Sequence, residues 1–355
     1  MPTEIRAIKT GGGDLPAEAL IISGDCQNRF ANNGWNWFIE QFGDKITTKD
    51  ITNAWRMFSA SDRITKIPFD LNFRSIDRYH NLNQIFNICY NLTQVPKLNN
   101  VKVYNTIEMF SSCNNLRTIP DDIADTWDWS YLESQTSNST GNQQSMFIGC
   151  CSLRSVPLNL IKSGNPYTSY QYSYFYNGFC NCYVLDKLIN LPIPYTKATW
   201  TSNAFYDTFN NCHRLKNITF KTNDDGTAIA VKWKKQVIDL SNYVGYAVYP
   251  NNILEYNSGI TSKKRVTDDT TYQALKNDPD WWTTDVNYSR YNHDSAVRTI
   301  NSLPDTSAYL ATAGGTNTIK FAGASGINTD GGAINTLTES EIAVATAKGW
   351  TCSFV

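Results

Sequence analysis

The chain has 355 residues, of which 41% are hydrophobic and 18% charged, and this balance predicts a folded protein. The 31 Lys and Arg residues against 32 Asp and Glu give a formal net charge of −1. Because the densest basic run is only Lys263 to Arg265, the sequence argues against nucleic acid as a partner. No apolar run approaches the roughly 20 residues that span a bilayer, so we expect no membrane insertion.

The N-terminal segment predicts an arm followed by an atypical first unit. Residues 1–15 contain Gly11 to Gly13 and no apolar core of a signal peptide, so we expect a flexible arm without an export signal. Leu20 to Ile22 predicts a strand, and Asn33 to Phe42 predicts an aromatic-rich helix that ends at Gly43.

An internal repeat is the strongest signal in the sequence. Six copies share a pattern of Phe, then in most copies Cys three residues later, Leu after three more, and Ile or Val after a further three, often followed by Pro. Start-to-start spacings are 28, 24, 37, 32 and 30 residues, and Ser61 replaces Cys in the first copy. The expected core positions are Phe58, Phe86, Cys89, Leu92, Phe110, Cys113, Leu116, Phe147, Cys150, Leu153, Phe179, Cys182, Leu185, Phe209, Cys212 and Leu215.

One copy illustrates the structure expected of each unit. Ile107, Phe110 and Cys113 recur every three residues, which predicts one apolar face of a short helix. Leu116 to Ile119 predicts a short strand, which Pro120 ends because it has no N–H to donate. Burying three or four side chains at about 1.5–3 kcal/mol each cannot offset ordering a whole unit at ~1–2 kcal/mol per residue. We therefore predict stacked units, an α/β solenoid over residues 16–220.

The segment from Met109 to Pro120, MFSSCNNLRTIP, resembles the BspA-like class of leucine-rich repeats. These repeats occur in bacterial surface proteins and in proteins of phages, including crAss-like phages. The resemblance covers about residues 50–220 and implies a coil of short helix plus short strand that binds rather than catalyses. The variable spacing departs from a regular array and predicts loop insertions at Trp127 to Gly141 and Ser163 to Tyr176.

Residues 221–292 predict an irregular β-rich and helical connecting region. Asn223 to Gly226 reads as a turn rather than a calcium loop, because alternating acidic ligands are absent. Lys232 to Tyr249 is strand-like, and Thr270 to Asn277 predicts a short helix.

Residues 293–355 predict a C-terminal capping repeat, which also resembles the end of BspA-like proteins. We expect a helix at Asp294 to Leu303 and a strand at Thr318 to Phe321. Thr338 to Glu341 has the sequence of a capping box, which predicts a helix up to Lys348. A final strand is expected from Trp350 to Val355.

The sequence offers little catalytic chemistry. Five of the nine cysteines hold one repeat position, so we expect a ladder of small buried side chains rather than disulfides or a metal site. Cys212 and His213 resemble a nucleophile and base only by adjacency, and neighbouring helical residues point in different directions. No metal, cofactor or catalytic residue is predicted.

Alternating tyrosines form the candidate interaction surface: Tyr167, Tyr170, Tyr172, Tyr174 and Tyr176. In a strand, the alternation from Tyr170 to Tyr176 would place those four rings on one face. Such a face suits glycan stacking or a protein contact. The alternative is that the rings cover the core of their own insertion.

The leading functional hypothesis is a non-enzymatic structural or binding protein of a phage virion, such as a head or tail fibre or a decoration protein. Its partners would be other virion proteins or a cell-surface receptor, with a homo-oligomer possible. The alternative is a bacterial surface adhesin for a glycan or host protein. A glycan-active enzyme is less favoured and would need two carboxylates about 5–10 Å apart in a cleft.

Overall fold

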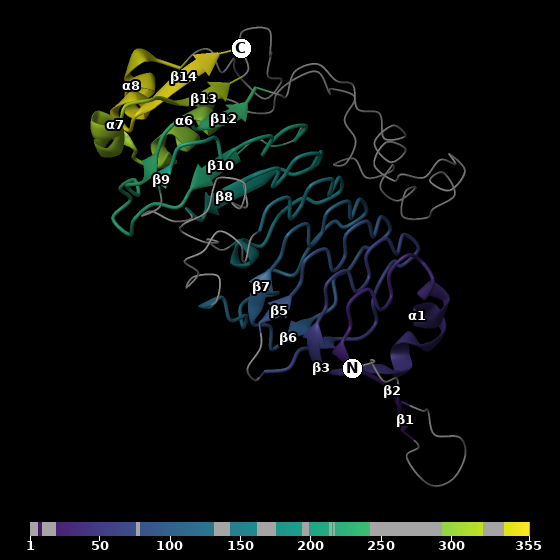
Figure 1. Cartoon of the computed structure of the whole chain (residues 1–355). Coiled ribbons are helices and arrows are strands. Elements are labelled where there is room, and N and C mark those ends of the chain that lie inside the picture. Colours follow the sequence, from purple (N-terminus) through teal and green to yellow (C-terminus); the bar gives the residue numbers. More distant parts are fainter. Residues whose placement is uncertain are drawn as a thin grey trace, which may run out of the picture.

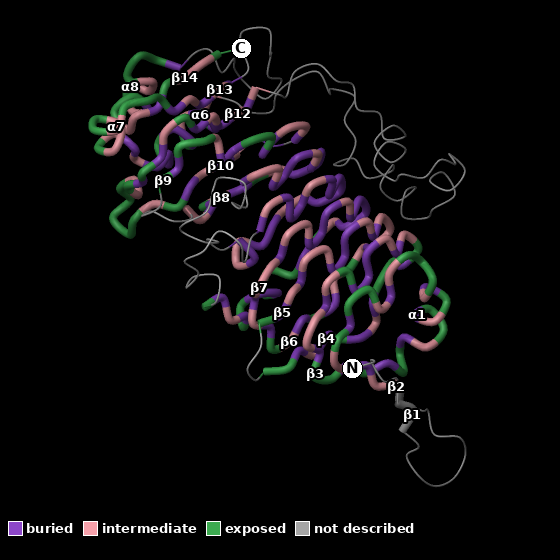
Figure 2. Tube along the Cα trace, in the orientation of Figure 1, coloured by how far each residue is buried: buried purple, intermediate pink, exposed green. Residues whose placement is uncertain are grey.

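In the computed structural model the described residues are 6–8, 19–75, 79–130, 143–161, 175–193, 199–212, 215, 217–241, 293–321 and 337–354. The chain winds into coils that stack along one direction, from β2 and α1 at one end to β14 at the other (Figure 1). Buried residues run through the middle coils, and exposed ones gather at α1, α7 and α8 (Figure 2).

The first coil combines strands and a helix. β1 (Arg6–Ile8) pairs antiparallel with β2 (Ala19–Asp25), which pairs in parallel with β3 (Ile46–Asn53). Between β2 and β3 lies α1 (Asn36–Phe42). Gly43 has a φ of −55° and continues into the short 3-10 helix Gly43–Lys45, so the helix does not end there in a left-handed residue.

Short parallel strands join the middle coils. β4 (Leu71–Asn72) pairs with β6 (Leu98–Asn99), and β5 (His80–Asn81) pairs with β7 (Val103–Asn105). Further along, β8 (Lys187–Leu191) pairs with β10 (Asn217–Phe220), and β9 (Thr199–Trp200) pairs with β11 (Lys232–Trp233). A 3-10 turn, η2, spans Leu158–Leu160.

The strand expected at Leu116 to Ile119 is absent from this described part of the chain. The Leu116 N–H bonds back within its own coil, to the Cys113 carbonyl at 3.1 Å. One backbone bond there, from Arg154 to the Arg117 carbonyl at 3.2 Å, reaches the preceding coil. A single bond does not make a strand ladder.

The predicted helix in each middle unit is replaced by consecutive turns. The Ser111 N–H bonds to the Glu108 carbonyl at 3.1 Å, three residues back. Glu108 and Ser112 have φ values of 50° and 60°, which no α-helix accommodates. An apolar spacing of three fits such turns as well as it fits a helix.

The turns repeat with the same register in each coil that carries a repeat Phe, from Phe30 to Phe209. One left-handed residue lies two positions before the repeat Phe in each coil: Asn28, Arg56, Gln84, Glu108, Ser145, Asn177 and Asp207. A second lies two positions after it: Asn32, Ala60, Ile88, Ser112, Gly149, Asn181 and Asn211. These residues turn alternate backbone N–H groups toward the next coil. The Phe110 N–H, for example, donates to the Met146 carbonyl of the next coil at 3.0 Å.

The core is a continuous stack along the coils. All sixteen expected repeat-core residues are at most 2% exposed. The repeat Phe rings stack on each other at centroid separations of 5.3 to 6.0 Å, in the order Phe30, Phe58, Phe86, Phe110, Phe147, Phe179 and Phe209. Phe30 belongs to a coil that the sequence repeat does not reveal, because Cys and Leu are missing from it.

Helix-plus-strand coils do occur at the C-terminal end. β12 (Val237–Leu240), β13 (Asn317–Phe321) and β14 (Trp350–Phe354) form one parallel sheet. Three helices accompany it: α6 (His293–Ser302), α7 (Ser307–Ala313) and α8 (Glu339–Ala347). α7 was not expected from the sequence, and the helix expected at 270–277 lies outside the described residues.

The C-terminal coils are bonded to the repeat. The Thr299 hydroxyl of α6 donates to the Ile218 carbonyl of β10 at 2.5 Å, and the Ser302 hydroxyl accepts the Phe220 N–H at 3.0 Å. The Trp350 indole donates to the Pro304 carbonyl at 2.8 Å. This end of the chain therefore packs as a continuation of the stack.

Candidate interaction surface

Most of the tyrosine surface expected from the sequence lies outside the described residues. Tyr167, Tyr170, Tyr172 and Tyr174 fall there, and Tyr176 is described. The Tyr176 ring stacks on Tyr206, one coil further on, with centroids 5.4 Å apart and planes 19° apart. Tyr206 is 51% exposed, so this pair presents a flat aromatic surface to solvent.

A hollow of about 220 Å³ lies beside Tyr206. Its walls come from the coil that contains Tyr206 and from the two following strands, β12 and β13. The polar side chains in the lining are Asn203, Tyr206, Asp207, Thr208, Asn210, Asp239 and Lys320. The phenyl rings of Phe205 and Phe209, both buried, lie behind them.

Two lining residues are held in place by their own bonds. The Asp239 carboxylate accepts the backbone N–H and the hydroxyl of Ser241 at 3.0 and 2.5 Å, and it pairs with Lys320 Nζ at 3.4 Å. The Asn203 Oδ1 accepts the N–H groups of Phe205 and Val237, both at 3.0 Å. Their positions are therefore set before any ligand arrives.

Two other lining residues keep their polar groups available. Within the described part of the chain, the side chains of Asp207 and Asn210 make no hydrogen bond or ion pair. Asp207 is exposed and sits at a left-handed φ of 47°, at the turn position of its coil. With Asp239 and Lys320 paired, Asp207 leaves the hollow with one unbalanced negative charge.

Tyr206 and the hollow were not predicted from the sequence. A signal existed for Tyr206, because it precedes Phe209 by three residues just as Tyr176 precedes Phe179. Asp239 and Lys320 carried no such signal, since only the parallel pairing of β12 with β13 brings them together.

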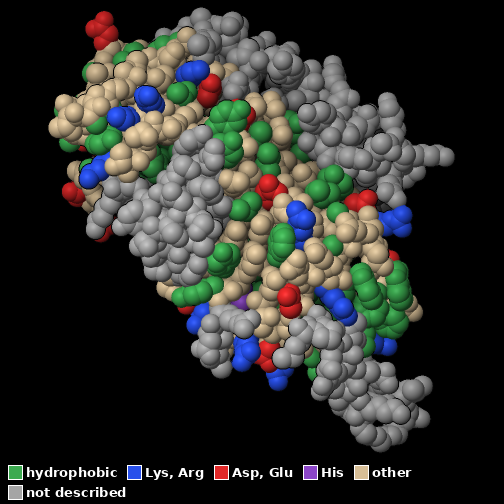
Figure 3. All heavy atoms as spheres, viewed as in Figure 1, with side chains coloured by type: hydrophobic (Ala, Val, Ile, Leu, Met, Phe, Trp, Pro, Cys, Tyr) green, Lys and Arg blue, Asp and Glu red, His purple; other side chains and the backbone are tan. Residues whose placement is uncertain are grey.

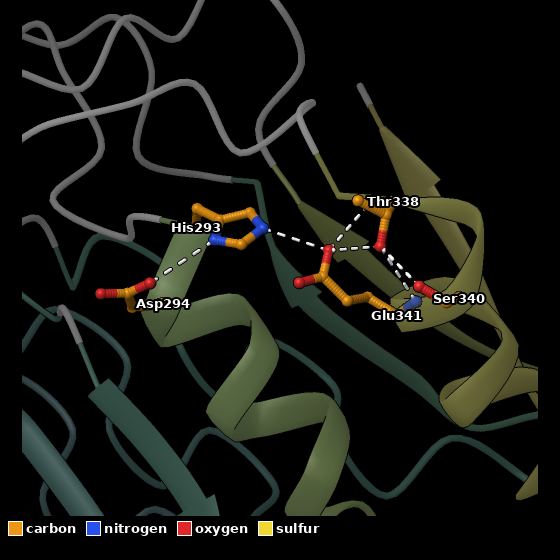
Figure 4. A network of polar contacts seen from close by, with 5 residues as sticks. All are labelled: His293, Asp294, Thr338, Ser340 and Glu341. Carbon is orange, nitrogen blue, oxygen red and sulfur yellow. Dashed lines mark hydrogen bonds and ion pairs between the residues drawn. The ribbon is translucent and has the colours of Figure 1, made fainter.

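A second polar cluster joins α6 to α8 (Figure 4). The His293 Nε2 lies 3.1 Å from Glu341 Oε2, and its Nδ1 lies 3.5 Å from Asp294 Oδ1. Glu341 also closes the predicted capping box with Thr338, whose N–H donates to it at 2.7 Å. The bond to Glu341, with a smaller part from Asp294, raises the pKa of His293.

This cluster links helices rather than assembling a nucleophile. The Ser340 hydroxyl pairs with the Thr338 hydroxyl at 2.9 Å, and no dashed line in Figure 4 joins it to His293. His213, the other histidine considered beside a cysteine, lies outside the described residues.

The cysteines are bonded thiols in the core. Each repeat Cys thiol donates to the carbonyl of the Phe one coil earlier, as from Cys150 to Phe110 at 3.0 Å. All nine cysteines are free, and eight are buried. Burial raises the pKa of Cys89 and of Cys150 to about 12, which leaves these thiols unreactive at neutral pH.

The described residues hold no group of three or more His, Cys, Asp or Glu that fits a metal ion. None of their helices combines the length and apolar character needed to cross a membrane. Uncharged polar side chains and backbone cover much of the described face in Figure 3, with charges of both signs scattered among them. That face presents no basic stripe.

Comparisons of the chain with protein-family models, with curated proteins and with solved structures found no match.

Proposed function

We propose that this chain is a leucine-rich-repeat solenoid of the BspA-like kind and serves as a non-enzymatic binding scaffold. The observation that carries the proposal is the regular bonding between coils. Each coil from Phe30 to Phe209 has two left-handed residues around a buried Phe, and in those from Phe30 to Phe179 the alternate amides bond to the next coil. Such one-dimensional stacking produces an extended, stiff surface with the same positions displayed coil after coil.

The displayed positions have the chemistry of a binding surface. The position three residues before the repeat Phe carries Trp55, Tyr176 and Tyr206 in three of the coils. Aromatic side chains supply large contact area at low entropic cost, and they are enriched where proteins bind partners. The stacked pair Tyr176 and Tyr206 is the clearest example.

We further propose that the scaffold is a virion component, docked on capsid or tail proteins or presented to a receptor. Support comes from the resemblance of residues 109–120 to repeats found in phage proteins and from the near-zero net charge. Quantitative mass spectrometry of purified phage particles from the source community tests it. A copy number that matches a capsid or tail symmetry is expected, and absence of the protein from particles would contradict this assignment.

The same measurement separates the alternative. BspA-like repeats also occur in bacterial surface proteins, so an adhesin shares the scaffold and differs in location. Enrichment of the chain on cell envelopes, together with absence from particles, would favour the adhesin. Either location leaves the binding role of the coils in place.

A further inference from the structure

We infer that the hollow beside Tyr206 is a binding site for one ring of a neutral saccharide, with the sugar face stacked on the Tyr206 ring. This inference rests on the proposed binding role and names the ligand class. It is carried by three observations: an exposed aromatic ring, an adjoining hollow, and polar side chains that surround that hollow.

The size of the hollow favours a small ring. Its volume of about 220 Å³ lies below the roughly 300–1,000 Å³ of pockets for drug-sized ligands. A peptide side chain would fill such a space only as part of a larger contact surface. The terminal sugar of an oligosaccharide needs space for only one ring, and the rest of the oligosaccharide can remain in solvent.

The polar groups match a ligand with many hydroxyls. An ionised carboxylate only accepts hydrogen bonds, and an amide both donates and accepts. Asp207 and Asn210 offer such groups without a hydrogen-bond partner of their own in the described residues. Sugar hydroxyls donate and accept on one ring, so they can satisfy both side chains together.

The charge of the hollow selects against anionic sugars. Lys320 is already paired with Asp239 at 3.4 Å, and Asp207 carries the remaining charge. A sialylated or sulfated ring would bring a like charge to Asp207, which costs binding energy. An uncharged hexose has no such penalty.

The site is also rigid, which lowers the cost of binding. Tyr206 is braced by its stack on Tyr176. Asn203 is fixed by bonds from the backbone N–H groups of Phe205 and Val237, and Asp239 by a bond from the N–H of Ser241. Preorganised side chains lose little freedom when the ligand arrives. The site therefore combines an aromatic platform with fixed and free polar groups.

The test uses the full chain and an array of defined oligosaccharides with neutral hexose, sialylated or sulfated ends. Capture of neutral oligosaccharides is expected, followed by a measurable affinity in fluorescence titration. Tyr206→Ala should weaken that affinity about tenfold or more, whereas Tyr206→Phe, which keeps the ring, should stay within about threefold. Asp207→Asn tests the free carboxylate and should also weaken it.

Trp37→Ala is the matched control, because Trp37 is also an exposed aromatic, at 57%, and lies on α1 at the other end of the stack (Figure 1). It should leave the affinity unchanged. Capture of anionic sugars only, no capture of any sugar, or an affinity insensitive to Tyr206→Ala would each overturn the inference. Particle mass spectrometry is independent of these outcomes, so the proposed virion role and the sugar site fail separately.

Discussion

The Cys113 thiol donates a hydrogen bond to the Phe86 carbonyl, one coil earlier, at 3.1 Å. The same relationship joins Cys89 to Phe58 at 3.1 Å and Cys212 to Phe179 at 3.0 Å. Ser61 takes this place in an earlier coil and donates to Phe30 at 2.6 Å. The repeat cysteine is therefore a donor between coils as well as a small buried side chain.

A pair of variants separates these two roles. We expect Cys113→Ser to be more stable than Cys113→Ala by about 1 kcal/mol, because Ser keeps a donor to the Phe86 carbonyl. A thiol that only fills space would give the opposite order, since a buried hydroxyl without a bond is costly. Urea denaturation of the two variants under the same conditions shows which of them is more stable.

A second prediction concerns the strain of non-glycine residues in the left-handed backbone conformation. Ile88 is half-buried with a φ of 60°, where a β-branched residue is strained by about 1–2 kcal/mol. The equivalent residues of other coils include Asn32, Asn181 and Asn211. Ile88→Asn should raise the urea midpoint, because relief of strain exceeds the loss of side-chain contacts.

Ile107→Asn is the matched control for this strain, since Ile107 is also half-buried and has no left-handed φ. It should lower the midpoint. If both variants shift in the same direction, strain at Ile88 is not the cause.

How far the sequence predicted this architecture depends on the kind of signal. The repeat spacing of Phe, Cys and Leu identified which side chains lie in the core, because burial follows directly from apolar periodicity. It could not distinguish a helix from consecutive turns, since both bring every third or fourth residue to one face. Glu108 and Ile88 carry no preference for the left-handed region that would have shown the difference.

Contacts between segments that are distant in the sequence could likewise not be predicted from local sequence patterns. The capping box at Thr338 is a local signal, and the structure confirms it. The approach of Asp239 to Lys320 depends on the pairing of β12 with β13, although residues 241–316 lie between the two strands in the sequence. No spacing along the chain encodes that proximity.

Acid should destabilise the chain through His80. This residue is fully buried against Phe73, its Nδ1 accepts the Lys102 N–H at 2.9 Å, and burial lowers its pKa to about 4. The native state therefore favours the neutral ring, so this stability is present above pH 6.5 and is lost as the pH falls from 6.5 to 4. The loss amounts to roughly 3 kcal/mol.

Denaturation midpoints at several pH values in this window measure the effect. The His80→Gln variant carries no titrating ring. Its free energy of unfolding should therefore depend less steeply on pH, because its unfolding no longer takes up the proton of His80. An equal pH dependence in both proteins would assign the acid sensitivity to other groups.

Alkali should destabilise the chain through its thiols. Burial raises the pKa of Cys89 and Cys150 from 9.0 to about 12. Both states are protonated below pH 9, and above it the unfolded thiols lose protons first, so stability falls as the pH rises from 9 to 12. Each buried thiol contributes up to about 1.4 kcal/mol per pH unit. Thiolate absorbance that appears near pH 9 in the native protein would contradict this.

Gly349 ends α8 at a φ of 80°, and a Cβ built there would lie 2.5 Å from Thr306 Oγ1 and 2.9 Å from Leu310 Cδ1. The Thr306 hydroxyl cannot retreat freely, because it donates to the Lys348 carbonyl at 2.9 Å. Gly349→Ala should therefore separate α8 from α7 and lower stability by more than the ~1 kcal/mol expected from left-handed strain alone. Gly226→Ala isolates that strain, since Gly226 also has a φ of 80° and a Cβ there meets nothing within 4 Å. A larger fall in the melting temperature for Gly349→Ala than for Gly226→Ala is the expected result, and equal falls would show that the crowding at Thr306 relaxes at no cost.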